Sequence, residues 1–318
     1  MDPMRRKRWG FYRLHARQRS RRSRRSFSLQ HVFPKCISLS YASAVLAGVL
    51  MPPLAFAGPY APAAGQTGST AIPNTSPSFV AWATSAVTLT RGPQDVAAPA
   101  GPFASFGDAS EAVGFAQGNY DQVVSLGDGG RITLAFAGGI RNGPGADFAV
   151  FENSINDTFL ELAYVEVSSD GSNFFRFDSA SVTPADSQVQ SFGQVDTSNV
   201  DGLAGKYRQG FGTPFDLSSL AGRSGLDVND VRYVRVIDVV GRVTAATDSS
   251  GSTFWSPSLD SSGRIINDPY NTPFETGGFD LDGVGVINAV PEPASLSCVA
   301  MAAAFFCRRA RRRRSCAS

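Results

Sequence analysis

The middle of the chain, residues 78–289, consists of short β-prone runs separated by turn-forming residues. Runs of β-branched and aromatic residues alternate with clusters of Gly, Asp, Asn, Ser and Pro. Helical periodicity is nearly absent, and only residues 213–220 are expected to form one or two helical turns. The expected strands are 79–89, 122–126, 131–136, 147–152, 159–168, 174–177, 231–240 and 279–287. Because the spacing of βαβ units is missing, the pattern predicts an all-β fold, an antiparallel β-sandwich resembling a jelly roll.

Two glycine-rich and aspartate-rich segments are expected to be hairpin turns. Residues 126–131 and 167–174 each lie between two expected strands. Gly and Asp accept the positive φ angles that tight hairpin turns require. Each segment therefore predicts a pair of antiparallel neighbours.

The N-terminal region has the features of an export signal. Twelve basic residues between Arg5 and Lys35 precede an apolar run, residues 37–57, which ends in Ala55-Phe56-Ala57. A signal peptidase needs such a small-x-small pattern in its narrow pocket. Residues 1–57 are therefore predicted to be a signal peptide with a long basic leader, cleaved after Ala57. Arginine pairs in the leader leave a twin-arginine export route as an alternative.

The C-terminal region, residues 290–318, combines three features in a fixed order. The motif Pro291-Glu292-Pro293 is followed by an apolar segment, 296–307, and then by six arginines between residues 308 and 314. This order closely resembles the PEP-CTERM sorting signal of exported bacterial proteins. The resemblance implies processing by a membrane-embedded exosortase and delivery to the cell surface, outer envelope or extracellular matrix.

The apolar part of this tail is short for a membrane-spanning helix. Residues 294–307 would extend about 21 Å as a sorting helix. A bilayer crossing usually takes about 20 residues. Transient insertion into the inner membrane is therefore expected, and permanent anchorage is not.

Removing the two ends changes the charge of the chain. Of the 29 basic residues, 12 precede residue 58 and six follow residue 290, which leaves 11. Of the 27 acidic residues, 25 lie between these positions. The remaining body carries a net charge of about −14, whereas phosphate binding needs a basic face. Nucleic acid is therefore not expected as a partner.

The same body contains no cysteine and no histidine. The four cysteines and two histidines all lie in the terminal regions: Cys36, Cys298, Cys307, Cys316, His15 and His31. Disulfides, thiolate nucleophiles, Ser-His-Asp triads and the usual zinc sites are thereby excluded from the body. Carboxylate, hydroxyl, amide, arginine and aromatic groups, with the single lysine Lys206, remain for its chemistry.

Residues 58–77 differ in composition from the β-rich body. They consist mainly of Ala, Pro, Gly, Ser and Thr, with few large apolar side chains. A segment of this kind buries too little apolar surface to offset the entropy of ordering. It is therefore expected to be a flexible spacer.

Two groups of acidic residues are candidate Ca²⁺ ligands. Asp280 and Asp282 alternate along an expected strand, so both carboxylates share one face about 6.5 to 7 Å apart. Asp268 lies in the preceding loop, and the three could hold a hard cation through oxygen. Glu152 and Asp157, around the loop 153–157, form the second group. A solvated strand end or a paired polar rim explains Asp280 and Asp282 equally well, and a structural role without metal is favoured for the second group.

Three aromatic residues of the long polar segment 248–278 are candidate ligand-binding residues. They are Trp255, Tyr270 and Phe274. Aromatic faces beside Asn, Asp and Arg suit a sugar, because the faces cover C–H groups and the polar groups bind hydroxyls. Alternatively, these side chains pin a long loop to the core.

Three stretches resemble strands of galactose-binding-like β-sandwiches. They are residues 146–153, residues 161–171 with a Ser-Ser-Asp-Gly turn, and residues 278–286, rich in Asp, Gly and Val. The resemblance implies a β-sandwich, and in many such domains a sugar site on the loops and a structural Ca²⁺.

Together these features predict an exported, non-enzymatic protein of the cell surface or matrix. Its expected partners are signal peptidase and exosortase during export, and an exopolysaccharide afterwards. The alternative is a carboxylate-dependent glycan hydrolase or lyase, which needs a pair of acids about 5 to 9.5 Å apart. Among 25 acidic residues such a pair is expected by chance.

Overall fold

The computed structural model describes residues 58–291. The predicted cleavage site at Ala55 and Ala57 lies outside these residues. So does the predicted sorting signal beyond Pro291, including Glu292 and Pro293. Both remain predictions.

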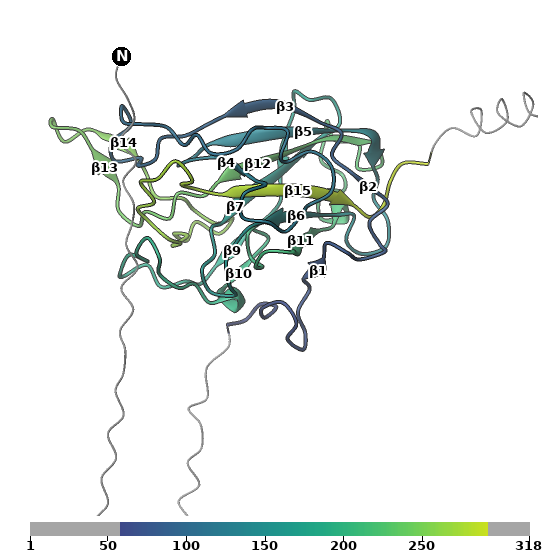
Figure 1. Ribbon diagram of the computed structural model, residues 1–318, viewed down its shortest axis with the longest axis horizontal. Helices are drawn as coiled ribbons and strands as arrows, with labels where there is room; N and C mark the ends of the chain where they lie inside the picture. The colour runs from purple at the N-terminus through teal and green to yellow at the C-terminus, as the bar shows by residue number, and fades with distance from the viewer. Residues whose placement is uncertain (1–57, 292–318) are drawn as a thin grey trace, which may run out of the picture. The chain divides into compact units, whose positions relative to one another are not determined.

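The described residues form two antiparallel sheets that face each other, β15 belonging to one and β3 and β5 to the other (Figure 1). The first sheet contains, in order, β1 (Ile72–Pro73), β11 (Phe211–Phe215), β6 (Phe148–Glu152), β15 (Asp280–Val286) and β2 (Ala81–Trp82), with β4 (Val124–Ser125) also paired to β15. The second contains β3 (Ser85–Thr90), β5 (Arg131–Ile140), β12 (Val231–Asp238), β7 (Ala163–Ser168) and β8 (Phe175–Arg176). The predicted all-β sandwich is confirmed.

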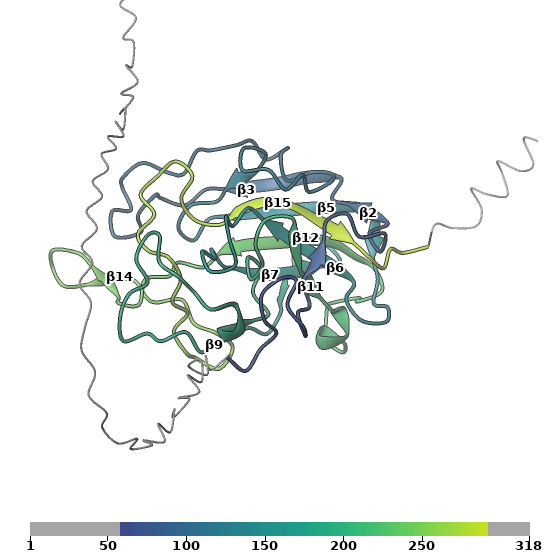
Figure 2. The ribbon, with the colours of Figure 1, turned by 60° about the horizontal axis from the view of Figure 1, so that its bottom comes forward.

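Two short strand pairs complete the described structure. One is β9 (Ala180–Ser181) with β10 (Val200–Asp201), and the other is β13 (Ala246–Thr247) with β14 (Thr253–Trp255). In both views β14 projects from one end of the sandwich (Figures 1 and 2). It is the end at which β15 begins.

The central strands are buried on both of their faces. Every residue of β6, β7 and β15 is buried. Their inward side chains, such as Phe148, Val165 and Val284, pack with those of the opposite sheet. The outward side chain of Phe151 is covered as well, because it packs against Phe79, just before β2, and against Trp82 of β2. Full burial of such a side chain contributes about 1.5–3 kcal/mol, which explains the long apolar runs in these strands.

One of the two predicted hairpins is confirmed and the other is wrong. Residues 167–174 join β7 to β8, which pair in the second sheet. Residues 126–131 instead connect β4 in the first sheet to β5 in the second. Gly127 and Gly129 do adopt positive φ, at 73° and 68°. The turn residues therefore fix a sharp bend, but they do not determine which sheet the next strand joins.

Helical structure within residues 58–291 is limited to two 3-10 turns, η1 (Thr197–Asn199) and η2 (Leu217–Leu220). The expected turns at 213–220 are thus confined to their second half, and the first half belongs to β11. Asp216 ends the strand and caps η2 by accepting a hydrogen bond from the Ser218 N–H at 2.8 Å. Among the described residues, no helix has the length and apolar character needed to cross a membrane.

Residues 58–77, which were expected to be a spacer, lie against the sandwich. Strand β1 pairs with β11. The N–H of Gly58 donates to the Ser198 hydroxyl at 2.6 Å, and the Thr70 and Tyr207 hydroxyls are 2.8 Å apart. Backbone and hydroxyl hydrogen bonds therefore hold a segment that has few large apolar side chains of its own.

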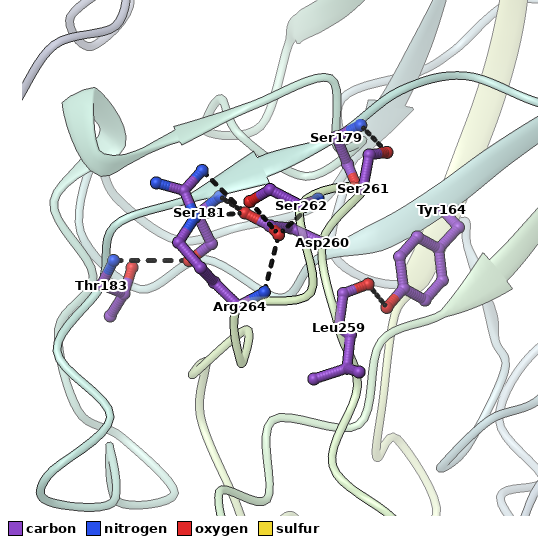
Figure 3. A network of polar contacts seen from close by, with 9 residues as sticks. All are labelled: Tyr164, Ser179, Ser181, Thr183, Leu259, Asp260, Ser261, Ser262 and Arg264. Atoms are coloured by element: carbon purple, nitrogen blue, oxygen red, sulfur yellow. Dashed lines mark hydrogen bonds and ion pairs between the residues drawn. The ribbon is translucent and has the colours of Figure 1, made fainter.

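The segment after β14 is fastened around Asp260, as Figure 3 shows. Its carboxylate accepts hydrogen bonds from the N–H groups of Ser181, Ser262 and Arg264, each at 2.9 Å, and from Arg264 Nε at 2.8 Å. Burial alone would raise the pKa of Asp260, but these hydrogen bonds outweigh burial and hold the pKa below its usual range. Nearby, the Tyr164 hydroxyl donates to the Leu259 carbonyl at 2.8 Å.

Candidate functional site

Acidic residues from both sheets meet at one end of the sandwich. Glu152 is the last residue of β6, and Asp280 is the first residue of its antiparallel neighbour β15. In the other sheet, Asp238 is the last residue of β12, and Glu161 precedes β7, the antiparallel neighbour of β12. Antiparallel pairing places the end of one strand beside the start of the next. The topology therefore gathers carboxylates that are far apart in the sequence.

A pocket of about 210 Å³ opens at this end. Glu161 and Asp280 supply its acidic groups, and Asn153 supplies an amide. Its aromatic lining consists of Tyr120, Phe159, Phe192 and Phe274. The pocket thus combines flat apolar surfaces with a few polar groups, as ligand-binding pockets commonly do.

Glu161 is the most unusual of these acids. Its residue surface is 7% exposed, and its carboxylate accepts no hydrogen bond from residues 58–291. Burial is the largest cause that raises its pKa well above the usual range, followed by the negative charges of Asp280, Glu152, Asp238 and Asp268. The protonated form of Glu161 is therefore favoured over the ionised form.

Asp280 shares the pocket with Glu161 but has hydrogen-bond partners. Its Oδ2 accepts from Asn153 Nδ2 at 3.2 Å, and its Oδ1 accepts from the Ser125 hydroxyl. Burial nevertheless raises the pKa of Asp280 to about 7, although these bonds and the charge of Arg91 act in the opposite direction. The Asp280 carboxyl therefore gains or loses its proton near neutral pH.

Two neighbouring acids each have one satisfied and one unsatisfied oxygen. Glu152 Oε2 accepts from the Ser154 N–H at 2.7 Å, and Asp268 Oδ2 accepts from the Leu162 N–H at 3.0 Å. Glu152 Oε1 and Asp268 Oδ1 are buried without a hydrogen-bond partner. Burial is the main cause that raises both pKa values well above their usual ranges.

Asp238 and Asp128 extend the acidic cluster along the second sheet. Asp238 accepts from the N–H groups of Gly129 and Phe279 at 2.8 and 2.7 Å, and burial raises its pKa to about 7. Asp128 accepts from the Val96 N–H at 2.6 Å. Burial, and then the charge of Asp238, raises the pKa of Asp128 to about 8. Both acids accept hydrogen bonds from backbone N–H groups, and neither lines the pocket. They contribute negative charge to this end of the sandwich but no pocket surface.

The five predicted Ca²⁺ ligands do not meet at one point. Asp282 accepts from the N–H groups of residues 117 and 118 at 2.8 and 2.7 Å, and burial raises its pKa to about 6. Asp157 is half-exposed and forms an ion pair with Arg208 at 2.5 Å. The remaining three, Glu152, Asp268 and Asp280, belong to the acidic end described above. Among residues 58–291, no three Asp, Glu, His or Cys side chains are placed to hold one metal ion together.

The three predicted sugar-binding aromatics lie in three places. Phe274 lines the pocket with Glu161. Tyr270 lines a separate pocket of about 440 Å³, where its hydroxyl donates to Asp95 at 2.5 Å. Burial, and then this hydrogen bond, raises the pKa of Tyr270 to about 12. Trp255, on β14, lies against Gly129 with its ring N–H buried and without a partner.

Sequence reasoning missed Glu161 and Phe192 in the pocket. A signal for Glu161 was available, because it is an acid between Leu160 and Leu162 at the start of an apolar run, and both leucines are fully buried. An acid inside such a run becomes buried together with its apolar neighbours. Phe192 had no comparable signal, since it stands alone in a polar loop.

Comparison with protein-family models and with curated proteins finds no match for the chain. This pocket and the sequence features of the two chain ends are the remaining indications of function.

Proposed function

We propose that this protein is an exported, non-enzymatic β-sandwich that binds a glycan in the aromatic pocket. The observation that carries the proposal is the pocket rim. The Phe192 ring lies 6.1 Å from Phe159 and 6.0 Å from Phe274, measured between ring centroids. Phe192 is 74% exposed, so the rim presents aromatic faces to solvent. Such faces stack on the C–H face of a sugar ring.

The polar lining of the pocket supports the same ligand class. Sugar hydroxyls can donate to the Glu161 and Asp280 carboxylates. Further polar groups are supplied by Asn153, Ser191, Thr272 and Thr276. A few oriented polar groups among apolar walls provide specificity in such sites.

The sequence features of the chain ends support the proposed location. Ala55-Phe56-Ala57 fits cleavage by a signal peptidase. Pro291-Glu292-Pro293, with its apolar and arginine-rich continuation, resembles the PEP-CTERM signal, so an exosortase is the proposed partner during sorting. An exopolysaccharide-rich envelope or matrix is the proposed destination, and its polysaccharide is the proposed ligand. The resemblance to galactose-binding-like domains agrees with this ligand class.

Binding of purified protein to a glycan array and to matrix polysaccharide tests the proposal. Phe192→Ala is expected to lower affinity at least tenfold, because it removes the exposed centre of the rim. Phe254→Ala is the matched control, since Phe254 is 43% exposed on β14, outside the pocket. Absence of binding, or equal loss in both variants, would contradict the proposal.

One observation favours the alternative of a glycan hydrolase or lyase. Glu161 lines the pocket with a raised pKa, which favours the protonated form that can donate to a glycosidic oxygen. Asp280 is the neighbouring carboxylate of the required pair. Release of reducing ends from matrix polysaccharide, abolished by Glu161→Gln and by Asp280→Asn, would replace the binding function with this activity.

A further inference from the structure

The acidic end of the sandwich has little positive charge to balance it. Among the described residues, Arg91 is the basic side chain whose charge lowers the pKa of one of these acids, Asp280. Arg91 does not form an ion pair with it. Its N–H groups donate to backbone carbonyls, including those of Phe106 at 2.9 Å and Ser125 at 2.5 Å. The acids of this end are Asp128, Glu152, Glu161, Asp238, Asp268 and Asp280.

Carboxylate oxygens without hydrogen-bond partners are a second observation at this end of the sandwich. Glu161 accepts no hydrogen bond from residues 58–291 and lines the pocket. Glu152 Oε1 and Asp268 Oδ1 also lack partners, and these residues are 1% and 2% exposed. A buried polar atom without a partner is costly, and an unpaired buried charge is costlier still. A bound proton or a bound cation removes that cost.

We propose that the floor of this pocket binds a hard divalent cation, Ca²⁺ being the probe, with Glu161 and Asp280 as its charged ligands. Glu161 has both oxygens free, and Asp280 exerts the largest effect on it among the neighbouring charges. The two carboxylates come from opposite sheets and meet in the same pocket. Glu152 adds a third negative charge close to Asp280.

The site is open. Since no three acids among residues 58–291 surround one point, two carboxylates leave most positions around the ion to neutral oxygens. Ca²⁺ takes six to eight oxygen ligands and accepts carbonyls, hydroxyls and waters. The pocket offers Thr272 and Thr276 hydroxyls and room for water. Weak affinity of about 10⁻⁴–10⁻³ M, typical of extracellular Ca²⁺ modules, is expected.

The cation site differs from the predicted Ca²⁺ groups in its central residue, and it shares Glu161 and Asp280 with the polar lining of the proposed glycan site. Glu161 takes the central place, whereas Asp157 and Asp282 have other partners. The cation lies at the floor of the pocket and the aromatic rings lie at its rim. Phe192→Ala should therefore leave cation binding unchanged, even if it abolishes glycan binding. The two proposals can fail separately.

Equilibrium dialysis with CaCl₂, and thermal unfolding with and without it, test the site on purified protein freed of metal by a chelator. At pH 8 the protein should bind one Ca²⁺ per chain, and its Tm should rise by several degrees. Glu161→Gln and Asp280→Asn should each weaken binding at least tenfold. Glu275→Gln, an exposed acid next to Phe274, removes the same charge outside the pocket and should bind normally.

Competition with protons provides a measurement that does not need a variant. The cation requires ionised carboxylates, so its affinity should fall as pH is lowered from 8 to 5. No Ca²⁺ binding at about 10 mM, well above the range of extracellular sites, would overturn the proposal. Unchanged binding in folded Glu161→Gln and Asp280→Asn would do the same. A Tm that rises on acidification, without any response to Ca²⁺, would also overturn the proposal, because it would show that protons alone neutralise these buried carboxylates.

Discussion

Asp260 and Glu161 are buried to nearly the same extent, yet their electrostatics are opposite. Their residue surfaces are 5% and 7% exposed. Asp260 accepts from three backbone N–H groups and from Arg264, and its pKa is lowered. Glu161 accepts none from the described chain, and its pKa is raised. Low solvent exposure alone therefore does not set the pKa of a carboxylate; the donors around it and the depth at which it is buried do.

The origin of the donors explains the difference. Asp260 is served largely by its own loop, since Ser262 and Arg264 follow within four residues. Glu161 lies just before a strand, between two buried leucines, where no loop folds back to provide N–H groups. Asp260 is thus satisfied by donors within the protein, whereas Glu161 has no hydrogen-bond donor among the described residues.

The largest expected effect is the loss of the Asp260 network. Asp260→Asn replaces one acceptor oxygen with a donor, which faces donors from Ser181 or Arg264. We expect the free energy of unfolding to fall by about 2–4 kcal/mol, as buried donors lose their acceptor. Urea unfolding at pH 7 measures it. A change below the error of that measurement would remove the contrast between the two acids.

The pH dependence of stability tests the acidic end as a whole. Asp128, Asp238 and Asp280 have folded pKa values of about 8, 7 and 7, all above the usual value of 3.8. The folded state then binds more protons than the unfolded state between about pH 4 and 8. Stability without metal should therefore be highest at mildly acidic pH and fall as pH rises to 8.

The steepest part of that fall should be about 1.4 kcal/mol per pH unit for each proton lost. Asp260 has the opposite sign, because its lowered pKa contributes stability above pH 4 that is lost in stronger acid. Unfolding midpoints in urea from pH 3 to 9 should show a maximum near pH 5. Stability that increases steadily from pH 5 to 8 in chelator would contradict the raised pKa values.

Glu161→Gln isolates one member of the acidic end. Burial raises the pKa of Glu161, so its presence costs the folded state stability as pH rises, and Glu161→Gln removes that cost; the variant should be more stable than the wild type at pH 8 by about 1 kcal/mol without metal. The difference should be smaller at pH 5, because a raised pKa lowers the stability of the wild type progressively as pH rises. The same substitution in a well-paired carboxylate destabilises, so a loss of stability at pH 8 would mean that Glu161 has a partner after all.

The smallest expected effect belongs to the pocket rim. Phe192→Ala should change the free energy of unfolding by less than about 0.5 kcal/mol, because its side chain is mostly exposed. Phe148→Ala, in the core, should cost about 3–5 kcal/mol in the same assay. A large loss with Phe192→Ala would indicate that the rim holds loops in place rather than binding a ligand.

The strands were predictable because their signal is local. Each expected strand region contains a strand of the structure, from β2 and β3 in 79–89 to β15 in 279–287. Strand β11 was missed because it contains Gly212 and Pro214, which usually exclude a strand. Pro214 is tolerated since β1 pairs only with residues 211 and 212, leaving an open edge beside the proline.

The candidate site was predictable only in pieces. Asp268, Asp280, Glu152 and Phe274 could be chosen from the sequence as acids and an aromatic near strand ends. Their association with Glu161 and Phe192 depends on which strands are neighbours, and strand order is not a local property. The misassigned turn at 126–131 has the same origin.

The position of Glu161 and Asp280 on opposite sheets has a mechanical consequence. An extended chain has no such pocket, so anything bound there is acquired only after the fold closes. A ligand bound to both residues would link the two sheets and resist their separation at that end. Occupancy and resistance to pulling should then increase together, as would suit a protein exposed to shear.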